Sequence, residues 1–146
     1  MTSVSEIMSS PVFCVESRSS IKRVAQLMAD HGIGCLIVTS QDGNMKIRDV
    51  GIITERDIVK RVAAKDLIPS KTKVEDVMTK PVVSLPLDAP VEEASEVMKE
   101  KNIRRLPITD KDTVVGMITI REVHLWLRLL TLRKALGRSE KYFRHD

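Results

Sequence analysis

Two short stretches each place a hydroxyl group and a carboxylate at the start of a predicted helix: GIITERD at residues 51–57 and GMITIRE at residues 116–122. In the first stretch Thr54 follows an apolar strand, and Asp57 stands three positions later. A threonine at such a junction can cap the helix by accepting a hydrogen bond from a first-turn amide, and the carboxylate then lies near the positive end of the helix dipole. Exposed amides and hydroxyls suit a phosphate, and a carboxylate suits a ribose diol. The stretch therefore predicts a polar corner that can hold a nucleotide, and Thr119 with Glu122 repeats it.

The elements that position these corners belong to a tandem duplication. VSEIM at residues 4–8 corresponds to VEDVM at residues 74–78, which is an offset of 70, and the alignment continues through both copies. After a longer loop in the first copy, residues 41–49, the offset falls to 65 and Gly51 aligns with Gly116. Because the spacing is otherwise kept, both polar corners belong to the same kind of repeated unit.

Each unit is predicted to run strand, helix, strand, strand, helix after a short helical turn. The helices follow from apolar residues at helical spacing, and Gly32 and Asn102 occupy the same aligned position just after the first helix, where a left-handed C-cap is expected. The predicted elements of the first copy are a turn at 5–8, strands at 12–15, 35–39 and 50–54, and helices at 21–31 and 55–64, with Ser19 or Ser20 as the first N-cap. Those of the second copy are a turn at 75–78, strands at 82–85, 106–109 and 114–119, and helices that begin at Asp88 to Pro90 and span 120–136.

The expected fold class is α+β, with two β-α-β-β-α units packed through their sheets around a pseudo-twofold axis. We expect the first unit at residues 1–64, a linker at 65–73, the second unit at 74–130 and a basic helix end and tail at 131–146. A unit of about 60 residues buries only a marginal core on its own. The two apolar sheet faces are therefore expected to cover each other.

Composition narrows the function. The net charge is +4 with a basic tail that includes Arg144, but aromatic residues make up only 3%, so a nucleic-acid partner is not expected. No apolar run is long enough to span a membrane, and the N-terminus lacks a signal peptide, which favours a cytoplasmic location with Cys14 and Cys35 as small buried thiols. The three histidines, His31, His124 and His145, have no metal-ligand spacing. With no catalytic signature either, we expect no enzyme, no metal and no cofactor.

The duplication, the Met-x-x-Pro motif at Met8 to Pro11 and Met78 to Pro81, and the Gly-apolar-apolar-Thr-x-x-Asp signature resemble the CBS domain family. Two such units in tandem resemble a Bateman module, and the likeness covers about residues 4–130. The resemblance implies two clefts between the units, pairing of modules into dimers, and the binding of an adenine nucleotide as a regulatory signal. The implied ligand is AMP, ADP or ATP, or less often S-adenosylmethionine.

The resemblance also implies roles for particular residues. Thr54 would contact ribose or phosphate and Asp57 the ribose hydroxyls, while Thr119 and Glu122 would serve the second cleft, where Glu replaces the usual Asp. The basic pair before Leu106 would supply phosphate contacts, since guanidinium groups can donate two bonds to phosphate oxygens. The full set of expected ligand-binding residues is Ser10, Pro11, Val12, Thr54, Arg56, Asp57, Lys80, Pro81, Val82, Arg104, Arg105, Thr119, Arg121 and Glu122.

Simpler interpretations stay open beside this one. The threonines and acids could be helix caps only, and Arg104 and Arg105 could form surface ion pairs with Glu96 or Glu100. The module could then be a structural or interaction scaffold that binds no ligand. In the leading interpretation a stand-alone module signals nucleotide binding to a separate, unidentified protein. The last helix carries more leucine than one sheet can cover, so we also expect a homodimer.

Overall fold

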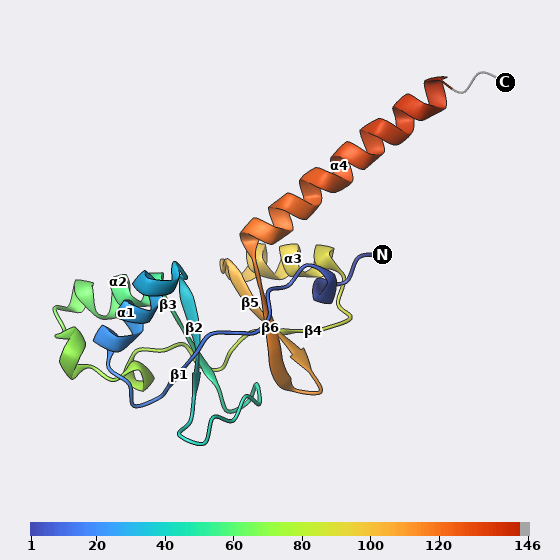
Figure 1. The fold of residues 1–146 in the computed structure, drawn as a ribbon. Helices are drawn as coiled ribbons and strands as arrows, with labels where there is room; N and C mark the ends of the chain where they lie inside the picture. Colours follow the sequence, from blue (N-terminus) through green and yellow to red (C-terminus); the bar gives the residue numbers. More distant parts are fainter. Residues whose placement is uncertain (144–146) are drawn as a thin grey trace.

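The computed structural model describes residues 1–143, with side chains as far as Gly137; Arg144 and His145 lie outside the described residues. It has the expected α+β architecture of two units, each with one sheet and two main helices (Figure 1). The elements of the first unit are η1 (Val4–Glu6), β1 (Cys14–Glu16), α1 (Ile21–His31), β2 (Cys35–Thr39), β3 (Gly51–Thr54) and α2 (Glu55–Arg61). Three single turns follow: η2 (Ala63–Lys65), η3 (Pro69–Lys71) and η4 (Val74–Asp76). The second unit contains β4 (Leu85–Pro86), α3 (Val91–Lys101), β5 (Arg105–Asp110), β6 (Thr113–Thr119) and α4 (Ile120–Phe143).

Both sheets have three strands in sequence order, β1-β2-β3 and β4-β5-β6. The first two strands of each sheet are parallel, because a helix carries the chain back between them, and the last two form an antiparallel hairpin. The register sets Cys35 opposite Thr54 in the first sheet and Arg105 opposite Thr119 in the second. Each sheet therefore ends with its threonine at a helix N-terminus beside the start of the middle strand.

The ends of the first helix in each copy confirm the caps predicted from sequence. Ser20 is the N-cap of α1, where its hydroxyl accepts a hydrogen bond from the Arg23 amide at 3.1 Å. Pro90 stands at the N-cap position of α3 and has no side-chain bond. Gly32 and Asn102 both end their helices in the left-handed region, with φ of 62° and 53°. Glycine and asparagine adopt this backbone at the lowest steric cost.

The two units exchange their leading segments. Val4, from the start of the first copy, is buried in the core of the second unit together with Met98 and Val123. Val74, at the corresponding place in the second copy, is buried in the core of the first unit with Ile21. Backbone hydrogen bonds hold both segments, from the Val4 amide to the Ala89 carbonyl and from the Val74 amide to the Ser19 carbonyl, each at 2.8 Å.

Two glycines allow this exchange to pack closely. A Cβ placed on Gly51 would lie 3.0 Å from Cγ of Met78 and closer still to its sulfur. A Cβ on Gly116 would meet Met8 in the same way, also at 3.0 Å from Cγ. The glycine that opens each polar stretch is therefore needed for the approach of a methionine from the other copy.

The sheets also share a core, as the sequence predicted. One hydrophobic cluster contains buried residues of both sheets, and its members are Ile37, Val50, Ile52, Val114 and Met117. Neither unit could cover these side chains alone, so the two units form a single folded body.

Several expectations from the sequence need correction. The first strand of each unit was placed too early, since β1 and β4 begin at Cys14 and Leu85, and α2 ends at Arg61 rather than at residue 64. Cys14 is exposed rather than buried, although it stands beside Ile37 of the shared core: it lies on the edge strand β1, where its sulfur meets Sδ of Met45 at 3.6 Å. The last helix was predicted to end at Leu136 but continues to Phe143, and it projects away from the rest of the molecule (Figure 1). Within residues 1–143, no helix is both long and apolar enough to cross a membrane.

Candidate functional site

A first cleft of about 360 Å³ lies between the units at the start of α2. Thr54, Arg56 and Asp57 line it from the first unit, and Pro81 and Val82 line it from the second copy. Arg104 and Arg105, at the start of β5, complete its polar lining, while Ile52, Ile103 and Pro107 add apolar surface. The cleft thus offers carboxylate, hydroxyl, guanidinium and apolar groups within one small volume.

The threonine and the acid of this cleft form a capping box. The Asp57 amide donates to the Thr54 hydroxyl oxygen at 3.2 Å, and the Thr54 amide and hydroxyl donate to Oδ2 of Asp57 at 3.0 and 3.1 Å. The other carboxylate oxygen, Oδ1, lies 3.8 Å from Nε of Arg61. The proposed helix-cap role is therefore real, and it leaves Oδ1 with only a distant ionic partner among the described residues.

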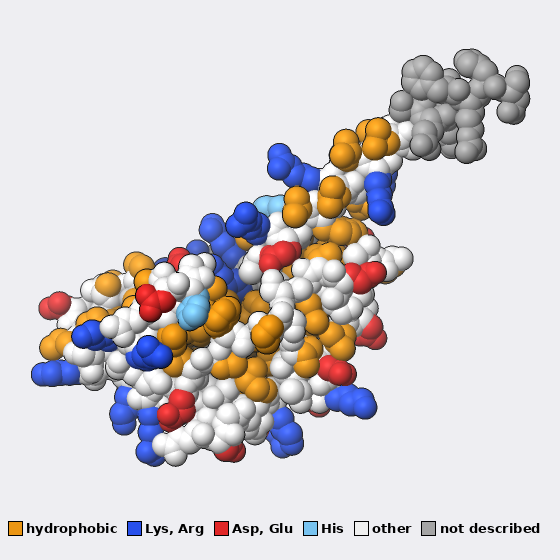
Figure 2. Space-filling view, viewed as in Figure 1, with side chains coloured by type: hydrophobic (Ala, Val, Ile, Leu, Met, Phe, Trp, Pro, Cys, Tyr) orange, Lys and Arg blue, Asp and Glu red, His pale blue; other side chains and the backbone are white. Residues whose placement is uncertain are grey.

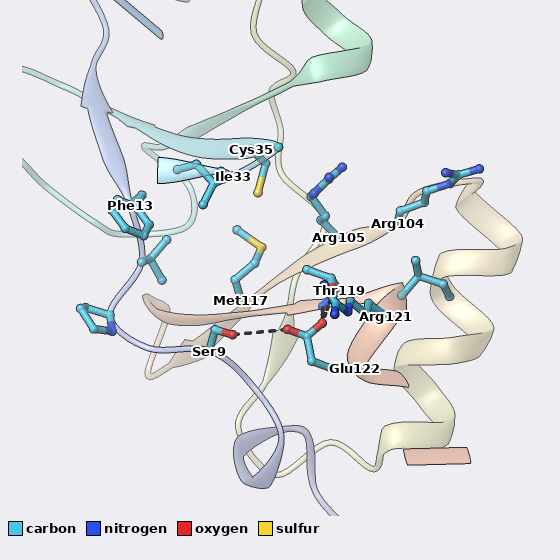
Figure 3. A pocket seen from close by; sticks show the side chains of 15 residues that line it. Ser9, Phe13, Ile33, Cys35, Arg104, Arg105, Met117, Thr119, Arg121 and Glu122 are labelled. Carbon is cyan, nitrogen blue, oxygen red and sulfur yellow. Dashed lines mark hydrogen bonds between the residues drawn. The ribbon is translucent and has the colours of Figure 1, made fainter. Parts of the chain in front are cut away.

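A second cleft, of about 510 Å³, lies at the start of α4 (Figure 3). Thr119, Arg121 and Glu122 line it from the second unit, and Pro11 and Val12 line it from the first copy. Its remaining lining includes Ser9, Phe13, Ile33, Gly34, Cys35, Met117 and again Arg104 and Arg105.

Glu122 accepts hydrogen bonds from Thr119 in the same way as Asp57 does from Thr54, despite its extra methylene group. Its Oε2 accepts from the Thr119 amide at 3.0 Å and also from the Thr119 hydroxyl. Its Oε1 accepts from the Ser9 hydroxyl at 3.3 Å, the contact drawn in Figure 3. Both oxygens of Glu122 are thus engaged within the protein, whereas Asp57 keeps one oxygen largely open.

Arg104 and Arg105 line both clefts. Gly34 makes room for Arg105, because a Cβ at Gly34 would lie 3.0 Å from Cζ of Arg105 and closer to its Nη2. The same Cβ would lie 3.0 Å from Oε1 of Glu55, so the guanidinium group reaches the start of the first unit's second helix. A single pair of cations at the start of β5 therefore lines both clefts.

The pKa of the Cys35 thiol is influenced by Arg105 and by an acid from each cleft. Burial raises its pKa, and the positive charge of Arg105 opposes that rise, while Glu55 and Glu122 reinforce it. Figure 3 shows Arg105 between Cys35 and Thr119. The arginine thus lies close enough to both clefts to influence a titrating group between them.

Twelve of the fourteen expected ligand-binding residues line at least one of the two clefts. Ser10 instead borders a third, shallower hollow with Cys14 and Val114. Lys80 donates from Nζ to the Asp49 carbonyl at 3.3 Å and is not among the described residues that line any of these hollows. The alternative ion pairs of Arg104 and Arg105 are absent from the described part of the chain, where the ion pairs are Arg48–Asp49 and Arg61–Asp57.

Sequence reasoning missed three residues that shape the clefts. Ser9 was passed over because a lone serine carries no distinctive pattern, and at Gly34 the sequence showed the lack of charge but not the room that it leaves for Arg105. Arg61 donates from Nη1 to the carbonyls of Val77 and Met78, at 3.1 and 3.0 Å, and also pairs with Asp57. Its position four residues after Asp57 on a helix was the available signal. Arg61 links the first cleft to the exchanged segment.

Two β-α-β-β-α units that exchange leading segments and enclose two clefts define a tandem module. Residues 4–64 and 74–128 match the family model of the CBS domain, so the chain belongs to the CBS domain family as a tandem pair. Such modules are of a regulatory, signal-transducing type and are generally not catalytic. Within the described residues, no group of three or more His, Cys, Asp or Glu side chains could hold a metal ion.

Three relatives align with most of this chain. An uncharacterized protein of Methanopyrus kandleri is 34% identical over 122 residues, which cover 83% of this chain and 60% of that protein. The CBS domain-containing protein YhcV of Bacillus subtilis is 35% identical over 120 residues, which cover 82% of this chain and 81% of YhcV. A homoserine O-acetyltransferase of Methanohalobium evestigatum is 36% identical over 123 residues, 84% of this chain but 23% of that enzyme. The chain thus spans less than two thirds of the first and third of these relatives.

Solved structures share the fold. An uncharacterized conserved protein from Pyrococcus horikoshii superposes with a TM-score of 0.79 at 26% identity, covering 87% of this chain and 92% of that one. A hexameric CBS-CP12 protein from bloom-forming cyanobacteria gives a TM-score of 0.76 at 28% identity, covering 84% and 69%.

Proposed function

We propose that this CBS pair binds an adenine nucleotide, AMP, ADP or ATP, between its units and signals the occupancy to another protein. The observation that carries the proposal is the pairing, in each cleft, of a threonine and a carboxylate at a helix N-terminus with Arg104 and Arg105. A phosphate suits the two guanidinium groups, because each can donate two charge-assisted hydrogen bonds. The apolar residues around them suit a base.

The first cleft is the stronger candidate. A ribose diol needs a carboxylate oxygen that is free to accept its hydrogen bonds. In Asp57 the oxygen Oδ1 has only Arg61 nearby, at 3.8 Å. In Glu122 both oxygens already accept bonds from Thr119 and Ser9. We therefore expect tighter nucleotide binding beside Asp57, and weaker or different binding beside Glu122.

A ligand in either cleft would act by shifting the relative packing of the units. The two arginines come from the second unit, while Thr54 and Asp57 come from the first. A ligand that touches both sides favours the packing in which both sets of contacts can form, and the effect is limited by its differential affinity for the two packings. A partner protein, or a second copy of this chain, would respond to that difference; the CBS-CP12 protein of similar fold is hexameric.

A scaffold without ligand is the second candidate. It is favoured by the capping box of Thr54 and Asp57 and by the hydrogen bonds from Thr119 to Glu122, which give these four residues a structural role that needs no ligand. The scaffold and the sensor make opposite predictions for ligand-dependent stability.

The test is thermal unfolding with AMP, ADP, ATP, S-adenosylmethionine and GMP, on protein shown to be free of bound nucleotide. A ligand at 100 times its dissociation constant stabilises the folded state by about 2.7 kcal/mol. In a domain of this size that corresponds to a rise in Tm of several degrees. A rise with adenine nucleotides that is lost in Asp57→Ala supports the first cleft as the site. No rise with any of them contradicts the sensor and favours the scaffold.

A further inference from the structure

Helix α4 has two apolar faces, and the body of the molecule covers only one. Val123 is fully buried, and Trp126 packs against the core of the second unit. A second row of leucines stays exposed: Leu125, Leu129, Leu132 and Leu136 are 57%, 54%, 56% and 57% accessible. At about 100° of rotation per residue, this row lies roughly 120° around the helix from Val123 and Trp126. The helix projects from the body, and Figure 2 shows hydrophobic side chains along it.

The exposed row, which we call the leucine seam, has the spacing of a coiled coil. Its four residues are separated by four, three and four positions, which is the alternation of a and d positions in a heptad repeat. A single exposed leucine is ordinary on a protein surface, but a regular seam on a projecting helix indicates a helical partner.

We propose that the leucine seam pairs with the same seam of a second copy of this chain, in antiparallel orientation. The 4-3-4 spacing reads the same in both directions, so a reversed second copy matches every leucine. Leu129 then packs against the partner's Leu132, and Leu125 packs against the partner's Leu136. This pairing buries all four exposed leucines of each chain in alternating a–d layers.

The charges beside the seam decide the orientation. Arg128 precedes an a position and Arg133 follows a d position, so they occupy the g and e positions that flank the core. In a parallel pair, each g residue faces the e residue that lies five positions later on the other helix. Arg128 of each chain would then face the partner's Arg133, once on each side of the pair. In an antiparallel pair, g faces g and e faces e. Arg128 then faces the partner's Ala135, and Arg133 faces the partner's Trp126, where a cation can lie on an aromatic ring. Like-charge repulsion therefore disfavours the parallel pair.

The antiparallel pair also keeps the two bodies apart. Each body sits at the N-terminal end of its own α4, so reversal of one helix sends the bodies to opposite ends of the pair (Figure 1). The same helix carries Arg121 and Glu122 of the second cleft in its first turn. The dimer contact and this cleft are thus joined by one continuous helix.

Sedimentation velocity on the whole chain at micromolar concentration tests the association without any nucleotide. The wild-type protein is expected to be a dimer, and Leu129→Glu and Leu132→Glu are expected to be monomers with unchanged circular dichroism. Thr131→Glu is the matched control, because Thr131 is exposed on α4 but lies off the seam, and it should stay dimeric. A monomeric wild-type protein would overturn the proposal and leave the seam for another partner. A dimer that survives Leu129→Glu would overturn it too, because association would then use another face.

Cross-linking tests the orientation. On a background with Cys14→Ser and Cys35→Ser, a Leu125→Cys protein is mixed with a Leu136→Cys protein and oxidised. The antiparallel pair predicts disulfide-linked heterodimers of the two proteins, separable by a tag on one of them. Homodimers of each protein would show a parallel pair and refute the orientation. Because neither experiment uses a ligand, the result is independent of nucleotide binding.

Discussion

The substitution Gly34→Ala should weaken nucleotide binding without unfolding the protein. Its new methyl group would occupy the space of the Arg105 guanidinium group, which lies 3.0 Å from that position at Cζ and closer at Nη2. Arginine has a long and flexible side chain, so it can move aside at little cost to the fold. The backbone at Gly34 does not lie in the left-handed region, so alanine adds no strain there. Loss of glycine also restricts the unfolded chain, which favours folding by about 0.4–1 kcal/mol.

The expected loss of affinity follows from the hydrogen bonds that the Arg105 guanidinium group would donate to a phosphate. A hydrogen bond to a charged group contributes about 1.5–3 kcal/mol. Because about 1.4 kcal/mol is a factor of ten in affinity, Arg105→Ala should weaken binding by roughly 10- to 150-fold. Gly34→Ala displaces the guanidinium group rather than deleting it, so we expect a smaller loss, at the lower end of that range. The two changes act on one contact, so Gly34→Ala should add almost nothing to Arg105→Ala.

Isothermal titration calorimetry of the two single variants and the double variant measures this coupling, with the nucleotide that gives the largest rise in Tm. Gly137→Ala is the control, because no atom lies within 4 Å of a Cβ at that position and it is far from both clefts along α4. Unchanged affinity in Gly34→Ala, or a full additional loss in the double variant, would refute the placement of Arg105. Weak binding by Gly34→Ala together with a Tm far below that of the wild type would show a general disruption instead.

Two further predictions test the charge and the packing without a ligand. Arg105→Ala removes a positive charge that lowers the pKa of Cys35, so the pKa of this thiol should rise. Alkylation of Cys35 by iodoacetamide, followed by peptide mass spectrometry, should then require a higher pH. An unchanged alkylation profile would show that Arg105 does not act on Cys35. Gly51→Ala should destabilise the fold by about 1–3 kcal/mol through overpacking against Met78, as measured by urea unfolding. Adding Met78→Ala should remove that penalty and adding Met8→Ala should not, so additive effects in both pairs would contradict the exchange of segments.

Most of the secondary structure was predictable because the signals are local. The bounds of the strand Cys35–Thr39 came directly from its apolar run, and the left-handed caps at Gly32 and Asn102 came from residue type and alignment. The duplication added weight, since each copy confirmed the other. The end of α4 was placed too early. No residue after Leu136 is a strong enough helix breaker to show from the sequence where the helix ends.

The exchange of leading segments was not predictable from these signals. Val4 and Val74 are equivalent in the repeat, and each could pack equally well on its own unit by pattern alone. The choice depends on long-range contacts, such as the two hydrogen bonds between Ser9 and Met117 at 2.8 and 3.0 Å. Periodicity records which face of an element is apolar, but it does not record which neighbour covers that face.

The same limit applies to the aligned positions at the start of the two middle strands. Copy one has Gly34-Cys35 where copy two has Arg104-Arg105, and the sequence alone does not show which cleft receives the arginines. In the folded protein Gly34 of the first copy lies against Arg105 of the second, and the arginine side chain fills the space that a larger residue at position 34 would occupy. An arginine at both positions would bring like charges together in one place, and a glycine at both would leave neither cleft with a cation from these positions. The small residues of the first copy and the arginines of the second are therefore complementary in shape and charge, and one pair of cations lines both clefts. The remaining difference between the clefts lies in their carboxylates, Asp57 in one and Glu122 in the other.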